Sequence, residues 1–363
     1  MDSQGDADAN LIRAARSSLV TGDGGAAVLE EAQQVPASLL QDRQALPSTR
    51  QTPAKTNSCL SLSLASAWIS VLAIAGCYVR IVLLASTPPT YTSYMSSQVV
   101  GSFILGLVVE TRNCWWEPVY VGIAVGLCGS ITTFSTWQVD AAENVGFPGY
   151  PITPSARAYN WFQTQMVGFA VPLCSLRFGK HCGLLCIGYF RLAADFRSAE
   201  AQYKWANNNR DWMTFVLLLV IICSVALSVV YTPSSTTIAL ILSPPGALIR
   251  YFLALRLNSP TRDRFPWGTF AANVGGSILS AALLIIESSM ESISPLSCAT
   301  LQGLRIVCGC LTTISTFVNE ISTLETRMAY IYGLSSLIAS QFCLLIMLRV
   351  SLSVGVIQFS AIC

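Results

Sequence analysis

Long apolar runs constrain this chain more than any other feature of its sequence. A helix needs roughly 20 mostly apolar residues to cross the hydrocarbon core of a bilayer. Only 11% of the residues are charged, whereas a soluble domain carries about 25%. The sequence therefore predicts an all-α membrane protein in the lipid bilayer. Its nine transmembrane helices are expected at about 61–85, 93–110, 117–139, 158–178, 211–231, 236–256, 266–287, 299–318 and 328–350.

The chain also repeats itself. Ser130–Trp137 reads SITTFSTW in the third apolar run, and Cys310–Phe317 reads CLTTISTF in the eighth. Gln98–Ser102 in the second run matches Asn273–Ser277 in the seventh. An odd helix between two four-helix halves reverses the topology of the second half. We therefore expect two inverted four-helix repeats joined by a central linker helix, an architecture typical of transport proteins with an ion site near the midplane.

These matches divide the chain into five parts. They are a disordered cytosolic tail (1–58), a first repeat (59–190), a basic loop with the linker helix (191–235), a second, inverted repeat (236–352) and a short C-terminal tail (353–363). The first part is too polar to bury enough apolar surface to fold alone. Lys and Arg residues gather on the side of this tail, and such residues mark the cytosolic side. Nine spans then place the N-terminus in the cytosol and the C-terminus outside.

The repeated motif is polar where hydrocarbon is expected. A Ser or Thr in a membrane helix can bond back to the carbonyl four residues earlier. Four hydroxyls in five positions, at matching places in both halves and just after Gly129 and Gly309, exceed that need. The sequence predicts a broken helix at each motif, because non-helical backbone at this depth is tolerated where protein or a water-filled cavity covers it.

Charged groups narrow the function. The carboxylates nearest the spans are expected at helix ends or in loops, and they are Asp140, Glu143, Glu287 and Glu320. A proton-coupled carrier usually has an acidic residue within the membrane, and a cation pore has acidic rings or carbonyl filters. Hydroxyl, amide and aromatic edges remain, and all present positive partial charge. This set of groups favours a transport pathway for a small anion. The net charge of +2 indicates no nucleic-acid partner. The sequence also contains no visible nucleophile–base set, so it does not predict an enzyme.

Three segments resemble the fluoride channels and their eukaryotic fluoride-export relatives. They are Gly129–Thr136, Phe265–Ser277 and Pro244–Tyr251, and the resemblance extends over about 61–350. It implies a passive fluoride-selective channel that exports cytosolic fluoride across the plasma membrane. Eukaryotic members fuse two halves, which implies that a single chain is functional.

The resemblance also implies a set of site residues. Amides and ring edges are expected to line the fluoride path, here Asn273, Gln98, Phe134 and Phe317. Hydroxyls are expected beside it, here Ser135, Ser315, Thr136 and Thr316. A structural Na⁺ is expected at the centre of the two repeats, held by backbone carbonyls of Gly129, Thr132, Gly309 and Thr312.

The two halves differ at the aromatic positions. Phe134 with Phe317 gives a complete pair, whereas the other pair is Trp137 with Ile314. Gln98 replaces the Asn of the family pattern. We therefore expect one functional pore and one vestigial pore.

Two other functions are compatible with the same pattern. A secondary carrier of another small solute would need a counter-ion or show saturating flux. A helical membrane scaffold, in which the hydroxyls serve only packing, would show no flux in liposomes.

Overall fold

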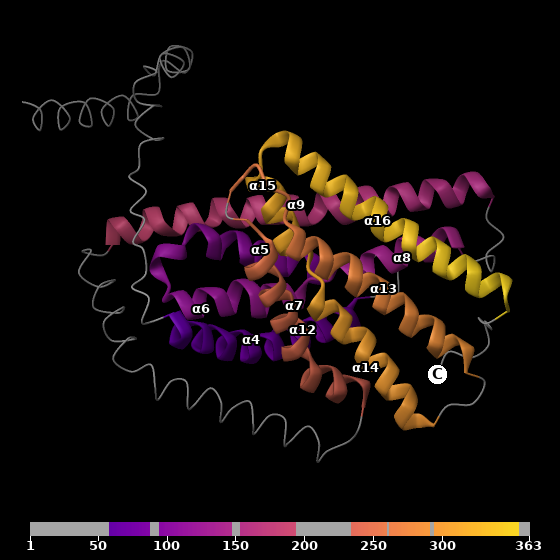
Figure 1. The fold of residues 1–363 in the computed structure, drawn as a ribbon. Coiled ribbons are helices and arrows are strands. Elements are labelled where there is room, and N and C mark those ends of the chain that lie inside the picture. The colour runs from indigo at the N-terminus through magenta and orange to yellow at the C-terminus, as the bar shows by residue number, and fades with distance from the viewer. Residues whose placement is uncertain are drawn as a thin grey trace, which may run out of the picture. The chain divides into compact units, whose positions relative to one another are not determined.

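The computed structural model describes residues 58–87, 94–146, 153–193, 234–259, 261–290 and 294–355. These residues form helices and no strand (Figure 1), so the all-α prediction is confirmed for them. The expected tail, the linker helix at 211–231 and most of the C-terminal segment lie outside the described residues.

Most of the predicted apolar runs are helical. In chain order the elements are α4 (Ser58–Ser86), α5 (Met95–Glu110), η1 (Arg112–Cys114), α6 (Glu117–Val121), η2 (Gly122–Cys128), α7 (Gly129–Ile131), α8 (Phe134–Gly146), α9 (Pro154–Ala193), α12 (Ser235–Leu257), α13 (Trp267–Ser289), α14 (Pro295–Leu311), α15 (Ile314–Thr323) and α16 (Thr326–Ser353). Within the described ranges, six segments are long and apolar enough to cross a membrane: Leu62–Ser86, Glu117–Val145, Ser235–Leu257, Trp267–Ser289, Pro295–Thr323 and Thr326–Ser353. The predicted span 93–110 corresponds to the shorter helix α5, and the span 158–178 lies inside the long helix α9, which is not among the six.

Glycines allow helices of this bundle to approach closely. α5 packs along α9, and α12 packs along α14. A Cβ at Gly106 of α5 would collide with the backbone of α9 at Leu176, and a Cβ at Gly179 of α9 would collide with the backbone of α5 at Phe103. Small residues at such contacts permit the backbone approach that stabilises helix pairs in lipid.

Two of the six segments are interrupted helices. Glu117–Val145 comprises α6, the π-helical η2, α7 and most of α8, whereas Pro295–Thr323 comprises α14 and α15. The π-helical stretch packs on α4, where Gly122 and Gly126 lie against Trp68 and Ile69. The corresponding part of the second segment is a regular α-helix, so the two halves differ in detail.

Candidate ion pathway

Both TTxST motifs interrupt their helices, as predicted. α7 ends at Ile131 and α8 begins at Phe134, and the same two-residue gap separates α14 from α15. Thr132 (φ −84°, ψ 153°) and Thr312 (φ −97°, ψ 157°) are extended. The next threonine caps the following helix, since Thr313 Oγ1 accepts from the Thr316 N–H. Hydroxyl caps of this kind satisfy backbone donors that a broken helix exposes.

A buried amide holds each break open. Gln98 Nε2 donates to the Thr133 carbonyl at 2.6 Å, and Gln98 Oε1 accepts from the Thr133 N–H at 3.2 Å. Asn273 makes the same pair of bonds with Thr313, at 3.1 and 2.8 Å. Both side chains are fully buried. For Thr133 in the first break and Thr313 in the second, the amides therefore replace the hydrogen bonds that a helix would have provided.

The hydroxyls of one break contact the other break. Thr132 Oγ1 accepts from the Ser315 N–H at 3.2 Å, and Thr312 Oγ1 accepts from the Ser135 N–H at 3.1 Å. Thr132 and Thr313 share a hydroxyl–hydroxyl hydrogen bond of 3.2 Å. Segments almost 180 residues apart thus form one network of hydroxyls in the buried interior.

The breaks also release backbone carbonyls. In a continuous helix each N–H bonds the carbonyl four residues earlier. The Thr133 N–H bonds Gln98 in place of the Gly129 carbonyl, and the Thr136 N–H bonds the Thr133 hydroxyl in place of the Thr132 carbonyl. The second half repeats this substitution. The four released carbonyls are those of Gly129, Thr132, Gly309 and Thr312. Such neutral oxygens suit a hard monovalent cation. Among the described residues, no group of three or more His, Cys, Asp or Glu side chains could hold a metal.

Each half also contributes a buried arginine to the break of the other half. Arg80 and Arg250 are 2% and 3% exposed. A Cβ at Gly309 would collide with the Arg80 guanidinium, and a Cβ at Gly129 with that of Arg250. Both arginines donate to backbone carbonyls of neighbouring helices. Two fixed positive charges beside the breaks attract an anion. The sequence pattern alone had assigned them no role in the site.

The four aromatic positions are fully buried in one cluster. The rings of Phe134 and Phe317 lie 5.3 Å apart at 67°, in an edge-to-face arrangement. The predicted pair therefore consists of direct neighbours. Trp137 also packs edge-to-face with Phe134, with centroids 5.4 Å apart, and Ile314 belongs to the same cluster.

The indole of Trp137 is hydrogen-bonded to α9 and packs against it. Its Nε1 donates to the Thr164 carbonyl at 3.0 Å, and its ring lies so close to Gly168 that a Cβ there would collide with it. The positive N–H edge of this ring therefore already has a protein partner.

A polar stripe on α16 was missed by sequence reasoning. Tyr332, Ser336 and Ser340 recur every four residues, so they share one helix face, and all three are fully buried. The Tyr332 ring lies 5.1 Å from that of Phe317. The Ser340 hydroxyl has no hydrogen-bond partner among the described residues. The four-residue spacing of polar residues in an apolar run was the signal that could have revealed the stripe.

The prediction of helix ends is confirmed for Glu143, Glu287 and Glu320, which lie in the last turn of their helices, whereas Asp140 lies further inside α8. None lies in a loop: Asp140 and Glu143 are in α8, Glu287 is in α13 and Glu320 is in α15. The predicted third and eighth spans ended too early, since the helices continue to Gly146 and Thr323. Glu320 accepts from Tyr332 Oη and from Thr269 Oγ1, both at 2.7 Å, and from Asn258 Nδ2 at 3.1 Å. Three donors thus stabilise a carboxylate one helical turn after Phe317.

Both halves of the chain match a known protein family. The family model described as "CrcB-like protein, Camphor Resistance (CrcB)" matches residues 67–172 and 237–351, more than half of the chain. The chain belongs to this CrcB-like family. The two matched segments fall within the two predicted repeats, although the repeat boundaries themselves stay a prediction.

Relatives of this CrcB-like protein include curated eukaryotic and bacterial proteins. Fluoride export protein 1 of Candida albicans is 26% identical over 299 residues, covering 73% of this chain and 74% of the relative. Fluoride export protein 1 of Schizosaccharomyces pombe is 27% identical over 298 residues, covering 76% and 93%. Fluoride-specific ion channel FluC of Phocaeicola vulgatus is 36% identical over 75 residues, covering 21% and 60%. No solved structure matches the chain.

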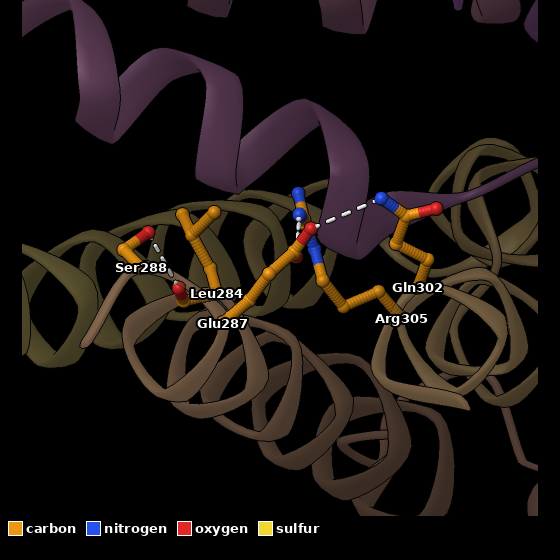
Figure 2. Close-up of polar contacts among 5 residues, drawn as sticks. All are labelled: Leu284, Glu287, Ser288, Gln302 and Arg305. Atoms are coloured by element: carbon orange, nitrogen blue, oxygen red, sulfur yellow. Dashed lines mark hydrogen bonds and ion pairs between the residues drawn. The ribbon is translucent and has the colours of Figure 1, made fainter. Parts of the chain in front are cut away.

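The CrcB-like chain contains a cavity of about 420 Å³ that reaches Thr136 at the first break. Arg80 and Thr136 line it, together with the acids Asp140 and Glu143 of α8. Glu287 also lines it, and Figure 2 shows this carboxylate of α13 facing two side chains of α14. Those side chains are Arg305, whose Nη1 lies 2.6 Å from Glu287 Oε2, and Gln302, whose Nε2 donates to Oε1 at 3.3 Å. The cavity thus joins the hydroxyl network to a charged rim.

Proposed function

We propose that this protein is a passive, fluoride-selective anion channel that exports cytosolic fluoride through the plasma membrane. The observation that carries the proposal is the pair of clamped helix breaks, whose hydroxyls meet beside the Phe134–Phe317 ring pair. Membership of the CrcB-like family and the names of the fluoride export relatives support it. An ion channel of this kind is not an enzyme.

Selectivity follows from the donors that these breaks provide. A fluoride ion that enters the protein must exchange water for hydrogen bonds, and hydroxyls donate to it. In our proposal Ser135, Ser315, Thr136 and Thr316 provide such donors. Each amide nitrogen carries two hydrogens, and the clamp uses one; in our proposal the second N–H of Asn273 and of Gln98 donates to the ion. The positive ring edges of Phe134 and Phe317 then bridge the apolar part of the path.

The direction of transport needs no pump. An inside-negative potential of 100 mV is worth about 2.3 kcal/mol for one elementary charge, which drives an anion outward. We propose two inverted four-helix repeats joined by a linker helix, nine spans in all. The N-terminus is then cytosolic and the C-terminus extracellular, and a single chain is functional.

We propose that the four released carbonyls, those of Gly129, Thr132, Gly309 and Thr312, hold a structural Na⁺ at the centre. The substitution of their helical partners by Gln98, Asn273 and capping hydroxyls supports this fit. The ion would supply a central positive charge that ties the two breaks together.

We further propose that only one pathway conducts. The Phe134–Phe317 pathway continues along the stripe of Tyr332, Ser336 and Ser340 on α16. On the other side Trp137 packs against Gly168 and donates to α9. Its pair with Ile314 makes this second pathway vestigial.

Purified protein in liposomes tests the proposed function. A K⁺ gradient with a K⁺ ionophore should drive fluoride release, and collapse of proton and Na⁺ gradients should leave the rate unchanged. Strict dependence on either gradient would instead identify a secondary carrier.

A further inference from the structure

Three buried glutamines form a chain of amides across the bundle. Gln138 of α8, Gln165 of α9 and Gln341 of α16 are 0%, 3% and 5% exposed. Gln341 Nε2 donates to Gln138 Oε1 at 2.8 Å, and Gln138 Nε2 donates to Gln165 Oε1 at 3.2 Å. Trp161 of α9 begins the chain, because its Nε1 donates to Gln341 Oε1 at 2.9 Å.

The tryptophan fixes the orientation of every amide that follows. An indole N–H can only donate, so the Gln341 atom that it contacts must be the oxygen. Gln341 then presents nitrogen to Gln138, which must offer oxygen, and Gln138 in turn presents nitrogen to Gln165. This order leaves the nitrogen of Gln165 at the free end. Among the described residues, no acceptor lies within hydrogen-bond distance of Gln165 Nε2.

The free end therefore consists of two N–H donors in the protein interior. Buried amide hydrogens nearly always have a partner, so these two donors are available to a ligand that accepts hydrogen bonds. The amide chain adjoins the proposed pathway at two positions in the sequence. Gln138 follows Phe134 by one helical turn on the same face of α8, and Gln341 adjoins Ser340, the end of the α16 stripe.

We propose that Gln165 Nε2 forms an additional binding subsite for a small anion, at the α9 end of the amide chain that Gln138 connects to α8. Trp161 is the positioning residue, because its N–H sets the direction of the amide chain without contact with the anion. This inference rests on the proposed function, since fluoride is the anion that would reach the site. It adds a donor from α9 to a path otherwise assigned to α8, α15 and α16.

A methionine substitution at position 165 tests the hydrogen-bond donors while it preserves the packing of the side chain. Gln165→Met keeps a side chain of similar length and removes both N–H donors. The matched control is Gln163→Met, two residues earlier on the exposed side of the same helix. Fluoride release from liposomes and the rise in Tm on fluoride addition are measured for both variants and the wild type. Gln165→Met should lower release about tenfold and reduce the Tm rise, because hydrogen bonds to a charged partner are among the stronger ones. Gln163→Met should stay within about twofold of the wild type, as surface substitutions usually do.

Further variants keep the test decisive. If Gln165→Met fails to fold, Gln165→Glu retains the acceptor for Gln138, replaces the NH₂ group by oxygen and should lose flux in the same way. Trp161→Phe should reduce fluoride release less than Gln165→Met does. When both substitutions are combined, Trp161→Phe should cause no further reduction. If Gln165→Met releases fluoride at the wild-type rate, the subsite is overturned and the proposed function stands. The acceptor of the Gln165 amide would then be a buried water. Wild-type protein with neither release nor a Tm rise would overturn both.

Discussion

Loss of the Asn273 amide tests whether the helix break depends on its clamp. In Asn273→Ala the Thr313 N–H and carbonyl lose partners at 2.8 and 3.1 Å. Both groups lie in the buried interior. An unsatisfied buried donor or acceptor costs about 1–3 kcal/mol, so the variant should lose about 2–6 kcal/mol of unfolding free energy.

Ser277→Ala is the matched control for this variant. Ser277 lies one turn further along α13, is equally buried, and donates only to the Asn273 carbonyl at 2.8 Å. Its removal should cost about 1 kcal/mol or less. Denaturant unfolding in detergent micelles gives the stability of both variants, and liposome release gives their flux. We expect Asn273→Ala to lose both stability and flux, and Ser277→Ala to retain most of each.

Loss of fluoride release without loss of stability in Asn273→Ala would refute the structural role of the clamp. If Asn273→Ala unfolds at the wild-type denaturant concentration but carries no fluoride, then the amide acts on the ion alone. The hydrogen bonds to Thr313 would then contribute nothing to the break.

Three further predictions concern the aromatic pair, the tail and sodium. Phe134→Ile and Phe317→Ile should each reduce fluoride release more than tenfold, since about 1.4 kcal/mol in a barrier is a factor of ten. Trp137→Ile should change release little at matched protein amount, and equal damage would mean that both pathways conduct. Removal of residues 1–55 should leave flux largely intact, and a truncated protein that reaches the membrane without carrying fluoride would contradict this. Replacement of Na⁺ by a large organic cation should lower the Tm, and an unchanged Tm would argue against the central Na⁺.

The polar centre of this molecule is visible in the sequence because a hydroxyl cannot be left unpaired in hydrocarbon. The repeated hydroxyls and their spacing were therefore enough to place Thr132 and Thr312 at helix breaks. Residue type also marked Gln98 and Asn273 as important amides. That each amide bonds the backbone of the break was not predictable, because the bond joins residues 35 and 40 positions apart.

Other features depend on contacts that no local pattern records. Glu320 lies at a helix end, as the sequence predicts, but the origin of its donors in α13, in α16 and at Asn258 after α12 could not be predicted. The contact of Arg80 and of Arg250 with the glycine of the opposite break depends on how the halves pack. The orientation of the glutamine chain needs the indole of Trp161, whose acceptor is 180 residues away.

The most direct test of the central claim is the ratio of fluoride to chloride release from liposomes that hold the purified wild-type chain. Fluoride- and chloride-selective electrodes would follow both anions after a K⁺ ionophore is added. We expect rapid fluoride release with little chloride release, because buried hydroxyl and amide donors favour the smaller and more strongly hydrogen-bonded ion. Equal release of the two anions, or no release of either, would contradict it.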